Sequence, residues 1–197
     1  MATKPTKKHN YFFLLVFALS VPFWVLGSFL DLREFIPINL PIAALMILCP
    51  ISAALILTTK AGKKNAVKIL LKQVADYKKI KNLIWCLPTF LLMPMLMLLA
   101  YVIMKWLYIP MPKPTIHISD VIILFVLFFI GAICEEVGWT GYITDPLQNR
   151  YGAFNASFII GTVWAVWHII PYVQAHRTSV WIFWQCVGMI AIRIIIV

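Results

Sequence analysis

Acidic residues are scarce in this sequence, and charges of either sign are few. Only seven aspartates and glutamates stand against 17 lysines and arginines, and charged residues fill 12% of the 197 positions. With 62% hydrophobic residues, this balance excludes an ordinary soluble domain and indicates a polytopic membrane protein. Six spans with short loops fill a chain of this length, so we expect a single membrane domain over residues 1–197.

Cysteine is sparse as well, and its spacing carries no motif. The sequence lacks a His-Glu-x-x-His pattern, so zinc is poorly supported as a cofactor, and no other cofactor is indicated. The spacing of the cysteines matches neither a zinc-binding nor a redox-active pair. It therefore predicts free thiols that are buried in the membrane. The four cysteines are Cys49, Cys86, Cys134 and Cys186.

The apolar runs predict an all-α fold, a helical membrane bundle with about six transmembrane helices. We expect Pro22 to break the first span and the polar stretch 145–152 to form a turn before the fifth. The predicted spans are residues 11–30, 37–59, 83–108, 121–143, 153–171 and 180–197.

The loop 60–82 is strongly basic, with Asp76 as its single acid. Basic residues in short loops beside spans mark the cytoplasmic side, which predicts a multi-pass protein of the cell membrane with a cytoplasmic N-terminus. Apolar residues alternate with the lysines at helical spacing, which predicts a basic amphipathic helix at the membrane interface that attracts anionic lipid. This placement argues against nucleic acid as a partner. The lysines are Lys60, Lys63, Lys64, Lys68, Lys72, Lys78, Lys79 and Lys81.

Two adjacent acids, Glu135 and Glu136, interrupt the otherwise uncharged run 121–143. Two ionised carboxylates near the middle of a span cost about 5–7 kcal/mol on insertion scales, so we interpret the pair as a functional site. Neighbours on a helix diverge by about 100°, which predicts that one carboxylate faces a cavity and the other a stabilising partner. A hydrogen-bonded clamp between helices is the alternative interpretation.

A second titratable group, His168, lies on the next predicted span, four residues after Trp164 and on the same helix face. A glutamate and a histidine around one water are the minimum needed to make a nucleophile. The alternative is a histidine that only bonds a neighbouring helix. The other histidines, His9, His117 and His176, are interpreted as loop or interface residues.

The string Glu-Glu-Val-Gly-Trp-Thr-Gly-Tyr at 135–142, followed by Trp164-x-x-x-His168, resembles the CAAX-protease and bacteriocin-processing (CPBP) family. These are intramembrane endopeptidases that include the type II CAAX prenyl endopeptidases. The resemblance covers residues 120–171 closely and the rest by layout.

This resemblance implies peptide-bond hydrolysis inside the membrane without a metal. It implies that Glu135 is the base that activates water, His168 its partner and Glu136 a supporting acid. It also implies supporting roles beside the catalytic residues for Trp164, Trp139 and Thr140.

Two departures from the family pattern bear on activity. Thr140 occupies the position where the family has an arginine, so we expect the acidic pair to lack a salt-bridge partner. The third motif, a histidine four residues before an asparagine, is absent, and the chain ends in an apolar segment, which we interpret as truncation. Whether this chain is an active enzyme is therefore left open.

The sequence thus favours an intramembrane endopeptidase with a glutamate- and histidine-activated water. Its partners would be membrane lipid and a peptide or protein substrate, either lipidated or of the bacteriocin type. Two other functions stay open: a non-catalytic immunity or peptide-binding protein of the same fold, and a proton-coupled carrier.

Overall fold

The computed structural model describes residues 8–30, 42–76, 82, 84, 86–111 and 118–196. Within these residues every regular element is helical and no strand occurs, which confirms the predicted all-α class. The start of the predicted second span, at 37–41, and His117 lie outside the described residues.

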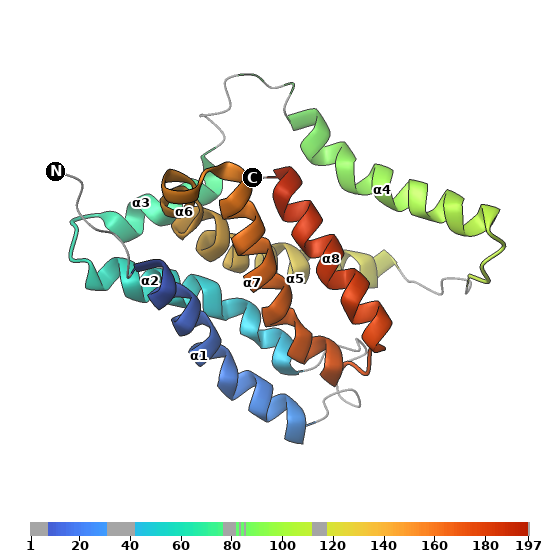
Figure 1. Ribbon diagram of the computed structural model, residues 1–197, viewed down its shortest axis with the longest axis horizontal. Helices are drawn as coiled ribbons and strands as arrows, with labels where there is room; N and C mark the ends of the chain where they lie inside the picture. Colours follow the sequence, from blue (N-terminus) through green and yellow to red (C-terminus); the bar gives the residue numbers. More distant parts are fainter. Residues whose placement is uncertain are drawn as a thin grey trace. The chain divides into compact units, whose positions relative to one another are not determined.

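The elements follow one another along the chain as a series of long helices with short helical connections (Figure 1). In order they are α1 (Lys8–Phe29), the 3₁₀ helix η1 (Ile42–Leu48), α2 (Cys49–Lys60), α3 (Ala66–Lys72), the 3₁₀ helix η2 (Gln73–Ala75), α4 (Cys86–Trp106), α5 (Ile118–Glu136), the π-helical segment η5 (Val137–Tyr142), α6 (Thr144–Tyr151), α7 (Ala153–Gln174) and α8 (Ser179–Ile196).

Among the described residues, six helical stretches are long and apolar enough to cross a membrane, as the sequence predicts. They indicate a multi-pass membrane protein. The stretches are His9–Phe29, Ile42–Lys60, Cys86–Trp106, Val121–Tyr151, Ala153–Gln174 and Ser179–Ile196.

The chain divides into two compact units, residues 1–74 with 127–197, and residues 75–126. The second unit contains α4 and the first half of α5, and α4 carries mostly exposed apolar side chains. The first unit holds the remaining helices, including the end of α5 where the acidic pair lies.

The core of the first unit forms between α1, η1, α2, η5 and α7, and α8 packs along α7 (Figure 1). The side chains of Phe12, Met46, Trp139 and Trp167 are almost wholly buried there. The Trp167 indole N–H donates a 2.7 Å hydrogen bond to the Ser20 hydroxyl, which joins α7 to α1. Paired indole and hydroxyl groups allow polar atoms to stay inside an apolar bundle.

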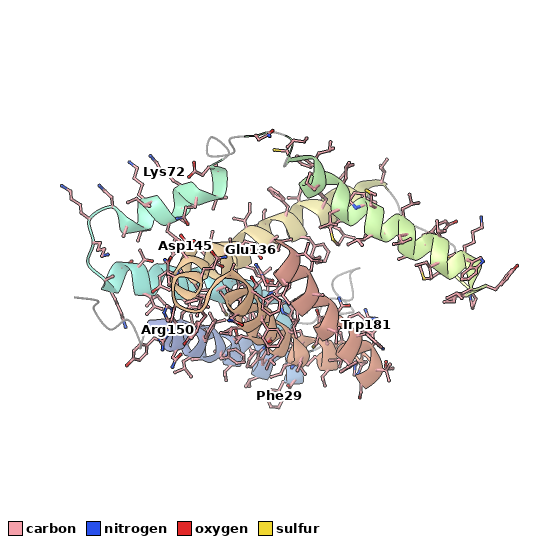
Figure 2. All side chains as sticks on the ribbon, turned by 45° about the horizontal axis from the view of Figure 1, so that its top comes forward. Phe29, Lys72, Glu136, Asp145, Arg150 and Trp181 are labelled. Atoms are coloured by element: carbon pink, nitrogen blue, oxygen red, sulfur yellow. The ribbon has the colours of Figure 1, made fainter. Side chains whose placement is uncertain are left out.

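The short helix α3 follows α2 and lies in the basic loop, where the sequence predicts an amphipathic helix. Leu70 is buried, whereas Lys68 and Lys72 are exposed. Figure 2 shows Lys72 on the outer side of α3. Two apolar side chains of this segment, Ile69 and Leu71, are also exposed.

Three local expectations are wrong. Helix α1 continues through Pro22, because a proline removes one helical hydrogen bond while its backbone angle stays helical. Residues 145–152, expected as a turn, mostly belong to α6, since Pro146 lies in its first turn, where its missing N–H costs nothing. His9, expected in a loop or at the interface, lies in the first turn of α1 and is buried, so the loop alternative is the part that is wrong.

Candidate active site

The first carboxylate of the pair, Glu135, lies in the last turn of α5 and faces α7. Its Oε2 accepts a 2.7 Å hydrogen bond from the Trp164 indole N–H, and its side chain is only 13% exposed. A carboxylate held by one directed donor keeps its second oxygen, Oε1, available for another partner.

His168 lies one turn after Trp164 on α7, with its side chain 15% exposed. Its Nδ1 lies 2.9 Å from the Trp164 carbonyl oxygen. Because a carbonyl only accepts, Nδ1 carries the proton of the neutral ring and Nε2 keeps its lone pair. That Nε2 lies 3.9 Å from Glu135 Oε1, too far for a direct hydrogen bond but within reach of one shared water.

Aromatic rings frame the histidine and fix its orientation. The rings of Trp164 and Trp167 stand edge-on to the imidazole at centroid distances of 5.3 and 4.8 Å, and Tyr172 lies 5.7 Å away. Trp139 packs against Trp167 behind this layer and is fully buried. The imidazole therefore has little freedom to turn away from Glu135.

The second carboxylate, Glu136, faces α8 instead of α7 (labelled in Figure 2). Arg193 donates two hydrogen bonds to it, from Nη1 to Oε2 at 3.0 Å and from Nη2 to Oε1 at 2.8 Å. Nη1 also donates to the Thr140 hydroxyl at 3.1 Å, and that hydroxyl donates to Glu136. The expected lack of a salt-bridge partner is therefore wrong, because α8 supplies the arginine.

Sequence reasoning missed Arg193, although a signal was present. It is the single charged residue of the last predicted span, 180–197, so the insertion cost that marks Glu135 and Glu136 marks it as well. The family motif has its arginine at the position of Thr140, whereas in this chain the guanidinium comes from a position 53 residues farther along the sequence.

The helix that carries the pair changes its winding directly after it. Residues 137–142 form a π-helical segment, in which the N–H of Ile143 bonds the Gly138 carbonyl five residues back at 3.2 Å. Gly138 packs directly on α2, since a Cβ at this position would come within 2.6 Å of Pro50. Such wide turns are frequent at functional sites.

The donors that the described residues bring together here are few for a metal site. In the described part of the chain, no three side chains of histidine, cysteine, aspartate or glutamate gather as a ligand set. The four cysteines lie there as free thiols, of which Cys49 is buried. Glu135 and His168 alone supply two ligands, fewer than the three protein ligands of a typical catalytic zinc site.

Comparison with known proteins points to one family. Residues 117–196, which include every residue of this site, match the family model described as type II CAAX prenyl endopeptidase Rce1-like. The chain is also 29% identical over 167 residues to CAAX prenyl protease 2 of Methanococcus maripaludis, a match that covers 80% of this chain and 60% of that protein. The chain thus spans less than two thirds of the length of that relative. The resemblance seen in the sequence is confirmed: this chain is similar to the type II CAAX prenyl endopeptidases.

Proposed function

We propose that this chain is an intramembrane endopeptidase in which Glu135 and His168 activate a water for attack on a peptide bond. The observation that carries the proposal is the 3.9 Å separation of Glu135 Oε1 and His168 Nε2, two largely buried acceptors on α5 and α7. Hydrogen bonds of about 2.8 Å let one water donate to both acceptors at once.

The orientation of the acceptors determines what that water can do. With one hydrogen directed to Glu135 and the other to His168, its lone pairs point away from both, toward an entering peptide carbonyl. Glu135 then accepts the proton as the oxygen attacks, and it passes a proton to the departing amine. Trp164 stabilises the carboxylate through its N–H, and the Trp164 carbonyl holds the imidazole tautomer.

The substrate follows from the relative and from the depth of the site. The relative is named for prenylated CAAX proteins, so we propose a lipidated C-terminal peptide as the substrate, with a bacteriocin-type peptide as the alternative. A site inside an apolar span suits a peptide that its own lipid delivers into the membrane.

The proposed orientation places the N-terminus on the cytoplasmic side of the cell membrane. The end of α2, the connection after it and the helix α3 support it, because five described lysines gather there and basic residues mark the cytoplasmic side. These are Lys60, Lys63, Lys64, Lys68 and Lys72.

The decisive experiment is cleavage of synthetic peptides by the purified chain in lipid vesicles. We expect cleavage of a prenylated C-terminal peptide, followed by mass spectrometry, and its loss in Glu135→Gln and in His168→Asn. Matched controls are Asp145→Asn and His176→Asn, which make the same chemical changes at exposed positions outside the site. Cleavage that persists in both site variants would contradict the proposal.

The same vesicles separate the other two functions. Binding of a peptide without cleavage by the wild-type chain would favour a peptide-binding or immunity protein of this fold. Loss of an imposed pH gradient without cleavage, abolished by Glu135→Gln, would favour a proton-coupled carrier.

A further inference from the structure

Arg193 carries a buried charge that the proposed water activation does not use. Its side chain is 1% exposed and belongs to α8, whereas Glu135 and His168 belong to α5 and α7. A buried arginine is costly unless an opposite charge neutralises it, and here Glu136 supplies that charge. The contacts of the Arg193 side chain with neighbouring residues therefore indicate the role of its charge in the site.

The first contact is the two-pronged pair with Glu136, reinforced by the Thr140 hydroxyl. Bidentate arginine–carboxylate pairs fix direction as well as distance. This pair commits the Glu136 carboxylate to α8. Of the two carboxylates, Glu135 is thus the one that interacts with Trp164 and His168 on α7.

The second contact is with the ring that holds the other glutamate. The Arg193 guanidinium carbon lies 4.8 Å from the centroid of the Trp164 ring, within the range of a cation–π interaction. The N–H of the same ring donates to Glu135 at 2.7 Å. One guanidinium thus contacts both the partner of Glu135 and the carboxylate of Glu136.

The backbone of α7 is shaped to admit this side chain. Gly161 lies one turn before Trp164, and a Cβ there would come within 3.1 Å of the Ile190 Cα and 3.2 Å of the Arg193 Cβ. A residue without a side chain therefore lets α8 approach α7 where Arg193 begins.

We propose that Arg193 is a positioning residue for the active carboxylate: by pairing with Glu136 and packing on Trp164, it holds the Trp164 N–H directed at Glu135. The expected effect of Arg193 substitutions on kcat rests on the proposed function. The structural content of the inference, the dependence of the Trp164–Glu135 hydrogen bond on Arg193, can be measured without any turnover.

The kinetic arm measures kcat and KM for the prenylated peptide. We expect Arg193→Lys, which keeps the charge but cannot form the bidentate pair, to lower kcat about 10-fold. Arg193→Gln, which also removes the charge, should lower kcat about 100-fold, and KM should change little in both variants. Arg193→Gln combined with Trp164→Phe should fall no further than the larger single effect, because both act through one hydrogen bond. Effects that multiply would overturn the inference.

The arm that needs no activity follows the ¹⁵N-labelled indole N–H of Trp164, assigned by its loss in Trp164→Phe. In Arg193→Gln we expect this resonance to move toward its position in Glu135→Gln, where the carboxylate partner is lost. An unmoved resonance in folded Arg193→Gln and Arg193→Lys overturns the inference, whatever the kinetics.

The matched control is Arg177→Gln, which removes an arginine that lies 5.2 Å over a different tryptophan, Trp181. It should leave both kcat and the Trp164 resonance unchanged. A wild-type chain that cleaves no peptide would refute the proposed function, while the resonance would still decide the role of Arg193.

Discussion

The indole N–H of Trp164 is bonded to Glu135 at 2.7 Å, so a tryptophan on α7 directs the carboxylate that would activate water. We expect Trp164→Phe to keep the ring under Arg193 but to remove this donor. Losing a hydrogen bond to a charged group costs about 1.5–3 kcal/mol, so kcat should fall about 10- to 100-fold. Peptide cleavage kinetics measure this change, and the exposed Trp184, changed to Phe, serves as control. An unchanged kcat would show that this bond does not matter for turnover.

Gly138 is expected to be intolerant of a side chain, because an added Cβ would lie 2.6 Å from Pro50 of α2. We expect Gly138→Ala to destabilise the fold by about 1–3 kcal/mol through overpacking. Thermal unfolding in detergent measures the effect. Gly188→Ala is the matched control, since nothing lies within 4 Å of its added Cβ. Removing a flexible glycine from a helix there should leave stability unchanged or raise it by up to about 1 kcal/mol. Equal effects at both positions would contradict this packing argument.

The bond between Ser20 and Trp167 is expected to stabilise the contact of α1 with α7. Ser20→Ala leaves the buried indole N–H without its 2.7 Å acceptor and should cost about 1–3 kcal/mol. The matched change Ser52→Ala removes a hydroxyl that donates to the Leu48 carbonyl within its own helical stretch and should have little effect. In the double variant with Trp167→Phe, the two losses should be less than additive. Additive losses would mean that the pair does not interact.

The proposed topology can be tested by labelling two connections. Lys64→Cys, in the connection between α2 and α3, should react with a membrane-impermeant maleimide only in inverted vesicles. Arg177→Cys, between α7 and α8, should react in intact cells. Both changes are made in a chain whose four native cysteines are replaced by alanine. The reverse pattern would place the N-terminus outside.

The six long apolar helices were predictable from sequence, because a segment that crosses a membrane must be a long apolar run and such a run satisfies its backbone as a helix. Helix α6 was missed although Thr144-Asp145-Pro146 is typical of a helix start, with an acid and a proline in the first turn. The motif placed Glu135 and Glu136 in one short segment, and their different partners followed from the angle between neighbouring residues.

The arginine at the site could not be derived from local pattern. Whether Arg193 reaches Glu136 depends on how α8 packs along α7, and this contact depends in turn on Gly161. Such a pairing is a property of the helix arrangement, because residues 57 positions apart have no fixed geometry in a sequence. The buried position of His9 in α1 depends on the same kind of information.

The wide turn at residues 137–142 holds one residue more than an ordinary α-helical turn. Deleting one residue there would close the i→i−5 bond to the ordinary i→i−4 pattern, so the helix before and after the turn could keep its faces while the side chains inside the turn shift by one position. Trp139, inside the turn, could not keep its buried contact with Trp167 after such a shift. Relatives that share the packing of Trp139 should therefore keep the spacing between the acidic pair and α6 constant.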